Sequence, residues 1–187
     1  MTKKKINVGI IGLGYLGKFH YEKFKANPMS SIKWVVDTDR AKLDQIKNEK
    51  INKTQDYRKI LDDVDAVSII TPTKSHHKIA KFFLSNKKDV LLEKPMTQNI
   101  TQANELIKIS KKNKTILQIG HLERFNPVMK ELTSQIKKPL FMEIHRLAKF
   151  NPRSTDVNVI FDLMIHDIDI ILSLVKKKIR KLSSFGK

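Results

Sequence analysis

The first 120 residues alternate between short apolar runs and longer stretches with helical spacing of apolar and charged positions. The apolar runs predict strands over Ile6–Ile11, Ile32–Val36, Ala66–Ile70, Val90–Leu92 and Ile116–Ile119. The stretches between them predict helices over Tyr15–Lys25, Asp39–Asn48, Lys74–Asn86 and Thr101–Asn113. Strands that read as apolar runs and are separated by helices indicate a parallel sheet covered on both faces. We therefore expect a doubly wound α/β domain.

The pattern changes after Ile119, where Gly120–Pro127 has the character of a joint. A helix is predicted over Pro127–Ile136, with Asn126 as its cap and proline at its first position. The remaining predicted elements are a strand, an apolar helix and a second strand, at Phe141–Leu147, Ile160–Val175 and Ile179–Phe185. We place a domain boundary between residues 1–120 and residues 121–187, and we expect the second domain to be partial.

Composition narrows the possible classes of protein. The net charge of +18 comes from 31 Lys and only 6 Arg, and the Lys residues are scattered along the chain. Nucleic-acid surfaces favour Arg forks interleaved with aromatic residues, so this charge does not predict a nucleic-acid partner. No run of about 18 apolar residues predicts a membrane span, and no signal peptide is recognisable. Cys is absent, which removes thiolate chemistry, and we expect a cytoplasmic protein.

A glycine motif follows the first predicted strand. Gly12-Leu13-Gly14-Tyr15-Leu16-Gly17 opens the first helix, and an acid, Asp37, ends the second strand. In a dinucleotide-binding fold the first glycine permits the tight turn, the second lets the backbone approach the pyrophosphate, and the third lets the helix pack closely. The strand, the helix and the acid are the context that this fingerprint requires. The motif therefore predicts a Rossmann-type dinucleotide site.

Asp37 bears on the choice of cofactor. Its carboxylate is expected to accept hydrogen bonds from the adenosine ribose and to repel a 2′-phosphate, which favours NAD over NADP. Arg40 keeps NADP open, because a nearby Arg can hold that phosphate. Asp39 has a simpler role available, as the cap of the next helix.

Two later segments carry candidate catalytic groups. Lys94 follows the strand Val90–Leu92, and residues at the carboxyl ends of such strands face the ligand crevice; the alternative is an ordinary surface Lys. The helix Ile160–Val175 is apolar nearly all round and is expected to be buried. It nevertheless carries Asp162, His166 and Asp169 at i, i+4 and i+7. A carboxylate beside an imidazole suits a general base, while a satisfied buried polar network is the alternative. No zinc spacing is present, so no metal is expected.

These landmarks together match one family. They are the Gly12/Gly14/Gly17 loop with His20 after it, Asp37, Thr71-Pro72 with His76, Glu93-Lys94-Pro95, and Asp162 with His166 and Asp169. The chain resembles the Gfo/Idh/MocA oxidoreductases over essentially its whole length. The resemblance implies a second domain built on a largely antiparallel sheet, of which only the start is present, and a homo-oligomer in the full-length form. Family members are longer, and we expect this chain alone to have little or no activity.

The resemblance also implies roles for individual residues. The catalytic group is Lys94, Asp162 and His166. The expected cofactor contacts are Gly12, Gly14, Tyr15, Leu16, Asp37, Thr71, Pro72, His76, Glu93 and Lys94. The expected substrate contacts are Arg124, Arg146, Arg153 and Asp169. The implied reaction is oxidation of a secondary sugar hydroxyl, with His166 as base, Lys94 as donor to the oxygen and Asp162 as orienting partner.

A narrower resemblance concerns the substrate. Gly120–Pro127 and His145–Arg153 are similar to segments of UDP-N-acetylglucosamine 3-dehydrogenases. Arg146 and Arg153 suit an anionic group such as a diphosphate, and an ion pair is the alternative for both. Three further hypotheses remain besides the sugar dehydrogenase. They are a nucleotide-binding sensor or regulatory module without turnover, a truncated fragment without function, and a basic nucleic-acid-binding protein, which a salt-dependent DNA-binding assay would test.

Overall fold

The computed structural model describes residues 5–147, 158–175 and 177–186. The chain divides into two compact units, Met1–Gly120 and His121–Lys187. Among the described residues, none of the helices combines the length and the hydropathy that a membrane crossing requires.

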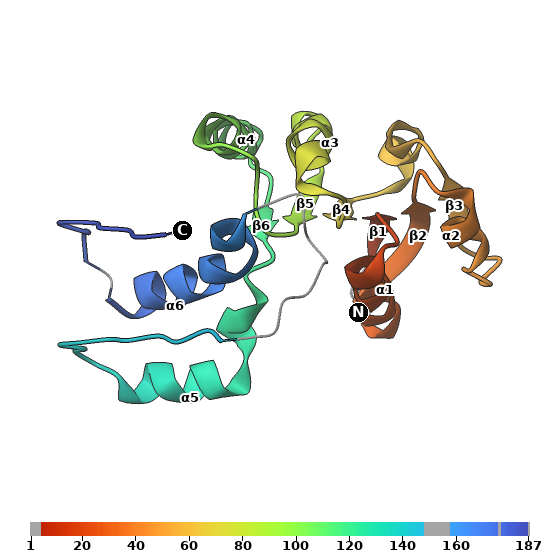
Figure 1. Ribbon diagram of the computed structural model, residues 1–187. Helices are drawn as coiled ribbons and strands as arrows, with labels where there is room; N and C mark the ends of the chain where they lie inside the picture. The colour runs from red at the N-terminus through yellow and green to blue at the C-terminus, as the bar shows by residue number, and fades with distance from the viewer. Residues whose placement is uncertain (1–4, 148–157, 176, 187) are drawn as a thin grey trace. The chain divides into compact units, whose positions relative to one another are not determined.

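The first unit is built on a six-stranded sheet. Its strands are β1 (Ile6–Ile11), β2 (Ser30–Val36), β3 (Asn52–Thr54), β4 (Ala66–Ile69), β5 (Asp89–Leu92) and β6 (Leu117–Ile119). They lie in the order β3-β2-β1-β4-β5-β6, and every neighbouring pair is parallel. This is the strand order of a Rossmann fold, in which the order reverses between β1 and β4. The predicted doubly wound parallel sheet is confirmed (Figure 1).

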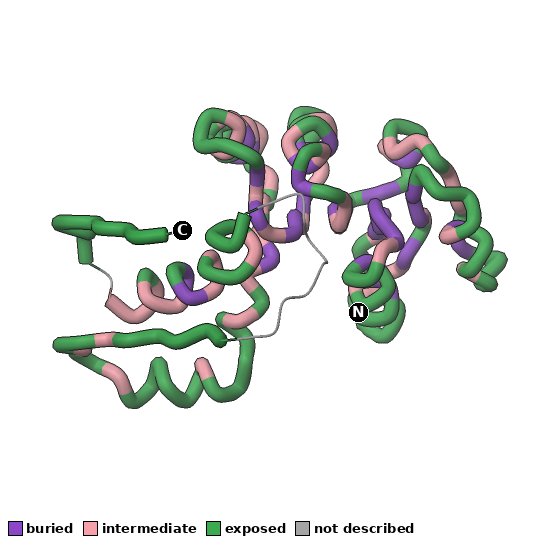
Figure 2. The backbone as a smooth tube through the Cα atoms, in the orientation of Figure 1, coloured by how far each residue is buried: buried purple, intermediate pink, exposed green. Residues whose placement is uncertain are grey.

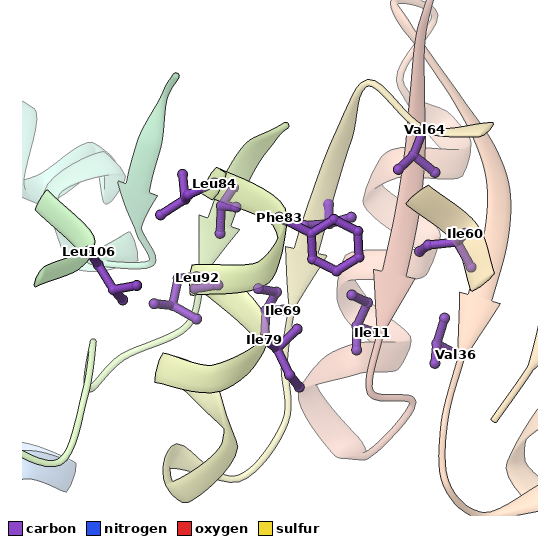
Figure 3. Close-up of a cluster of buried hydrophobic side chains, with 13 residues drawn as sticks. Ile11, Val36, Ile60, Val64, Ile69, Ile79, Phe83, Leu84, Leu92 and Leu106 are labelled. Atoms are coloured by element: carbon purple, nitrogen blue, oxygen red, sulfur yellow. The ribbon is translucent and has the colours of Figure 1, made fainter. Parts of the chain in front are cut away.

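Helices cover both faces of this sheet. They are α1 (Tyr15–Ala26), α2 (Arg40–Asp44), the 3-10 helix η1 (Tyr57–Asp63), α3 (Thr73–Ser85) and α4 (Ile100–Asn113). Successive strand residues point to opposite faces, so Ile10 packs with Tyr21 of α1 and Leu43 of α2. Ile11 packs in the other cluster, which is centred on Phe83 of α3 and includes residues from η1 and α4 (Figure 3).

Local sequence explains where the helices of this unit begin and end. Asp39 caps α2, as predicted, by accepting a hydrogen bond from the backbone N–H of Ala41 at 2.9 Å. The same helix ends at Asp44, earlier than predicted, and Asn48 instead accepts from the backbone N–H of Lys50 in a turn. The sequence pattern did not predict β3 or η1, because neither carries an apolar run of strand or helix length.

The second unit contains helices and no strand in its described part. Its elements are the 3-10 helix η2 (Leu122–Phe125), α5 (Pro127–Gln135), the π-helix η3 (Ile160–Met164) and α6 (Ile165–Val175). Asn126 caps α5 as predicted. The predicted strands Phe141–Leu147 and Ile179–Phe185 are wrong, since neither pairs with another segment there. A strand requires a hydrogen-bonded neighbour, which an apolar pattern alone does not provide.

The expectation of a buried helix over Ile160–Val175 is also wrong. Figure 2 shows that buried positions are concentrated in the first unit, while most of the second is exposed or intermediate. The apolar side chains of Ile160, Met164 and Leu172 are exposed, whereas the acids Asp167 and Asp169 are buried. Because the described part of its own unit contains no sheet to pack on, this helix buries the carboxylates that have arginine partners rather than its apolar surface.

Candidate functional site

The carboxyl ends of the parallel strands gather the predicted cofactor residues of the first unit at one edge of the sheet. Gly12 follows β1 and adopts a positive φ of 98°. Its backbone N–H donates to Val36 O at 2.7 Å, and a Cβ at this position would collide with the backbone carbonyl of Ile70. A Cβ on Gly17 would collide with the carbonyl of Gly12. Both glycines are therefore required by the turn and by the approach of α1 to it.

Gly14 differs from its two neighbours in the motif. It has an ordinary φ of −63°, and a Cβ built on it would meet no other atom within 4 Å. It is the N-cap of α1, where no described side chain provides a cap and the first turn carries no acid. The start of α1 thus offers backbone N–H groups and open space, which is the arrangement that receives a pyrophosphate. Tyr15 and Leu16 are exposed beside it.

Asp37 is tied directly to the glycine loop. The carboxylate is buried at the end of β2, where Oδ2 accepts the backbone N–H of Leu13 at 2.7 Å. Oδ1 accepts the N–H of Asp39 at 2.9 Å. A carboxylate has about four acceptor positions, so these two bonds fix its orientation and leave capacity for ribose hydroxyls. The geometry fits the role predicted for Asp37.

A cation neighbours Asp37, and it differs from the one that the sequence indicated. Lys42 Nζ lies 3.7 Å from Asp37 Oδ1 and 4.0 Å from Asp39 Oδ2. Arg40, the expected candidate, pairs instead with Asp44 at 3.3 Å. The signal that could have identified Lys42 is helical spacing, because Asp39 and Lys42 are an i, i+3 pair.

His76 connects two loops at this edge of the sheet. The predicted cofactor segment Thr71-Pro72 follows β4 and leads into α3, which carries His76. The imidazole is 1% exposed, and its nitrogens lie 2.7 Å from Thr71 O and 2.9 Å from Pro95 O. The ring therefore joins the loop after β4 to the loop after β5. The Ser75 hydroxyl adds a bond of 2.7 Å to Thr71 Oγ1.

Glu93 and Lys94 directly follow β5. Glu93 is buried, whereas Lys94 is half-buried and precedes a cis peptide bond to Pro95. Burial alone would raise the pKa of the Glu93 carboxyl. The hydrogen bond from His20, the charge interaction with His20 and the hydrogen bond from the backbone N–H of Lys94 lower the pKa by more, so it lies below its ordinary value. Glu93 is therefore a carboxylate enclosed by protein donors. Sequence reasoning used His20 as a landmark only and gave it no role.

The second unit holds the other predicted catalytic and substrate residues. Asp162 lies in the π-helix η3, and His166 follows in the first turn of α6, so the regular α-helical spacing assumed for this pair does not apply throughout. Both side chains are half-buried. Arg153 lies outside the described residues.

Two arginine–aspartate forks organise this unit. Arg124 donates Nε to Asp169 Oδ2 at 2.6 Å and an Nη to Oδ1 at 2.5 Å. Arg146 binds both oxygens of Asp167, with Nη2 at 2.6 Å from Oδ1. The hydrogen bond from Arg146 lowers the pKa of Asp167. Burial raises the pKa of Asp169, but Arg124, His121 and His166 outweigh it and lower the pKa. The ion-pair alternative is thus realised for Arg146.

Comparison with known proteins identifies the family. Residues 6–121 match the family model GFO_IDH_MocA, described as an oxidoreductase family with an NAD-binding Rossmann fold. The chain belongs to the Gfo/Idh/MocA oxidoreductases. The site geometry agrees with that membership, because the glycine loop, the uncapped start of α1 and Asp37 fit a nicotinamide dinucleotide.

Individual relatives extend the similarity beyond the family model. The chain is 36% identical over 171 residues to the UDP-N-acetylglucosamine 3-dehydrogenase of Acidithiobacillus ferrooxidans, covering 90% of this chain and 54% of that protein. A solved structure of that enzyme matches with a TM-score of 0.84 over 92% of this chain and 57% of that one. The NAD-dependent scyllo-inositol 2-dehydrogenase of Bacillus subtilis is 26% identical, covering 98% of this chain and 58% of that protein. The chain thus spans a little over half the length of these relatives.

Proposed function

We propose that the protein is an NAD-dependent dehydrogenase that oxidises a secondary hydroxyl of a sugar or nucleotide sugar. The observation that carries the proposal is the location of Lys94 at the carboxyl end of β5, on the same edge of the sheet as the glycine loop and Asp37. That edge is where a Rossmann sheet binds its ligand. A half-buried Lys there suits hydrogen bonding to a hydroxyl oxygen.

The proposed chemistry divides between residues of the chain and the cofactor. NAD, when bound, supplies the acceptor for the hydride that leaves the substrate carbon. His166 takes the hydroxyl proton, Lys94 donates a hydrogen bond to the oxygen as negative charge develops on it, and Asp162 orients the imidazole. The hydroxyl carbon loses a hydride and its oxygen loses a proton, so the products are a ketone, a reduced nicotinamide and one proton.

For the substrate we propose a sugar of the kind named for the relatives. The 36% identity to a UDP-N-acetylglucosamine 3-dehydrogenase favours a nucleotide sugar over a free polyol. Arg146 was expected to hold an anionic group, yet its fork is already occupied by Asp167, and Arg124 is likewise held by Asp169. Any substrate contact by these arginines must use the donors that remain, because each guanidinium has five.

The test is direct. The protein is titrated with NAD and NADP, and the absorbance of the reduced cofactor is followed with UDP-N-acetylglucosamine, other UDP-sugars and inositols. Dehydrogenase function predicts NAD binding by this chain. In a form as long as its relatives it predicts substrate-dependent reduction as well, with turnover reduced about 10²–10⁴-fold in Lys94→Ala and His166→Ala. Lys108→Ala, an exposed Lys on α4, is the matched control and should retain turnover.

Other results would point elsewhere. NAD binding without reduction of the cofactor by any of these substrates, in a form as long as the relatives, would favour the regulatory module. Failure to bind either dinucleotide would overturn the proposal. Near-normal turnover in both Lys94→Ala and His166→Ala would refute the assigned roles.

A further inference from the structure

His20 links two strands of the sheet, β4 and β5, from its position on α1. Its Nδ1 lies 2.9 Å from Ser68 Oγ of β4, and its Nε2 lies 3.0 Å from Glu93 Oε1 at the end of β5. Ser68 is completely buried, and the His20 side chain is only 11% exposed. Gly120, which follows β6, completes the enclosure, because a Cβ there would lie 2.8 Å from Glu93 Oε1. The space around the carboxylate is therefore closely fitted.

The donors and acceptors of this cluster are mutually consistent. A carboxylate oxygen only accepts hydrogen bonds, so the proton faces Glu93 from His20 Nε2. The Ser68 hydroxyl donates to Nδ1 when the imidazole is neutral, and its oxygen accepts from Nδ1 when the imidazole is protonated. Each polar atom in the Ser68–His20–Glu93 cluster has a suitable partner, as a buried polar network requires.

The other carboxylate oxygen reaches the proposed catalytic residue. Glu93 Oε2 accepts the backbone N–H of Lys94 at 3.1 Å. The two oxygens of one carboxylate thus connect the imidazole of His20 to the main chain of Lys94. Rotation of the carboxylate would break both contacts, so the imidazole constrains the backbone from which the Lys94 side chain projects.

We infer that His20 is a positioning residue, which holds the Glu93 carboxylate against the backbone N–H of Lys94 and so fixes the location of Lys94. The inference rests on the proposed role of Lys94 in the reaction. It also ties that role to α1, the helix whose N-terminus adjoins the glycine loop. His20 acts through Glu93 and has no contact of its own with the reacting atoms in this scheme.

A second His–Glu pair provides a matched control. His77 Nε2 of α3 lies 2.7 Å from Glu105 Oε2 of α4, where Glu105 also pairs with Lys81 at 2.6 Å. The Glu105 side chain is 41% exposed. The chemistry of the contact is the same, but it is on the surface and involves neither Lys94 nor the strand ends.

The experiment follows the backbone amide of Lys94 by ¹⁵N NMR across an acid titration, with Lys94→Arg used for assignment. In the unmodified protein the amide resonance should move as Glu93 protonates, with a midpoint below the ordinary pKa of 4.5. His20→Ala removes a donor from the carboxylate, so the midpoint of the Glu93 titration should rise. The Lys94 amide should also move toward the position of an unbonded amide at neutral pH. His77→Ala should change neither quantity.

Two further variants keep the test decisive. His20→Gln retains a side-chain donor and should restore part of the Lys94 amide shift. If His20→Ala does not fold, Ser68→Ala replaces it, because this variant frees the imidazole without removing it. An unchanged Lys94 amide in every folded variant would overturn the inference.

The outcome is separable from that of the proposed function. In assays of turnover, His20→Ala should lower kcat about tenfold or more with little change in the KM for NAD, since a misplaced group acts on the chemical step. A Lys94 amide that depends on His20, together with normal turnover of Lys94→Ala, would refute the proposed function and leave the positioning contact intact.

Discussion

Asp37 accepts a hydrogen bond from the backbone N–H of Leu13 at 2.7 Å, so the acid that ends β2 also fixes the glycine loop after β1. One side chain therefore combines two tasks that the sequence pattern treats separately. It shapes the loop that is to receive the pyrophosphate, and it presents the charge that is to select the ribose.

Replacing Asp37 separates these two tasks. Asp37→Ser should weaken NAD binding about tenfold or more, because a hydrogen bond to a charged group contributes about 1.5–3 kcal/mol. NADP binding should change less or improve, since the repulsion of a 2′-phosphate is removed. Asp37→Asn keeps a side-chain oxygen that can accept the backbone N–H of Leu13, so it should lose only the discrimination between NAD and NADP. Dissociation constants for both cofactors measure these effects, and tighter NADP than NAD binding by the unmodified protein would contradict the assignment.

Lys42 is predicted to reduce the preference for NAD over NADP. Its ammonium lies 3.7 Å from Asp37 Oδ1 and partly offsets the negative charge there. Lys42→Ala should therefore weaken NADP binding about two- to fivefold, the range of a partly exposed ion pair, with NAD binding nearly unchanged. The control is Lys47→Ala, an exposed Lys beyond the same helix. Equal effects of the two variants on NADP would remove any specific role for Lys42.

Gly14 is expected to be needed for ligand binding and not for the fold, unlike Gly12 and Gly17. A Cβ there meets nothing in the protein, so Gly14→Ala should fold with stability within about 0.5 kcal/mol of the unmodified protein. It should nevertheless weaken NAD binding tenfold or more, because the methyl group occupies the approach to the pyrophosphate. Thermal unfolding measures the stability of Gly14→Ala, and calorimetric titration measures its affinity for NAD. Gly12→Ala and Gly17→Ala should instead lose stability, and unimpaired NAD binding by Gly14→Ala would place the pyrophosphate elsewhere.

The fork between Arg124 and Asp169 should make the second unit sensitive to acid. Because the folded pKa of Asp169 lies below its ordinary value, the stabilisation is present at neutral pH and is lost as pH falls through that folded pKa. In Arg124→Ala the burial of Asp169 remains while its main donor is gone, so the pKa of Asp169 should rise. The carboxyl ¹³C resonance of Asp169 reports this directly.

A control in the same unit completes this test. Arg180→Ala removes an exposed arginine and should leave the Asp169 titration unchanged. A midpoint for Asp169 that is the same with and without Arg124 would show that the fork is absent in solution.

The first unit could be predicted closely from sequence because its signals are local and mutually consistent. The apolar run Ile6–Ile11 and the glycines that follow it are explained by a buried parallel strand and a tight turn. Polar β3 escaped prediction since it is a strand only through pairing with β2. Phe141–Leu147 shows the converse, because its strand-like pattern has no partner in the described part of the chain.

Only part of the candidate site could be predicted from the sequence. Glycine motifs and the acid at a strand end have fixed spacings, so Gly12, Gly14 and Asp37 were identifiable in advance. The contact between His20 and Glu93 joins residues that are 73 positions apart, so no spacing rule predicts it. The contact between Lys42 and Asp37 joins residues only five positions apart, but it too depends on how the folded chain places the two side chains. Arg124 and Arg146 looked available for a ligand because the acids that occupy them lie on a distant helix.

The shortness of β3 has a consequence for how copies of the protein behave in solution. Strands at the end of a sheet offer unpaired backbone groups that can recruit another chain and start aggregation. At one end of this sheet the terminal strand, β3, consists of only Asn52, Lys53 and Thr54, and it presents a cationic side chain with no large apolar group. Growth of the sheet by addition of a foreign strand beside β3 is therefore disfavoured, even though the interior strands are rich in Val and Ile.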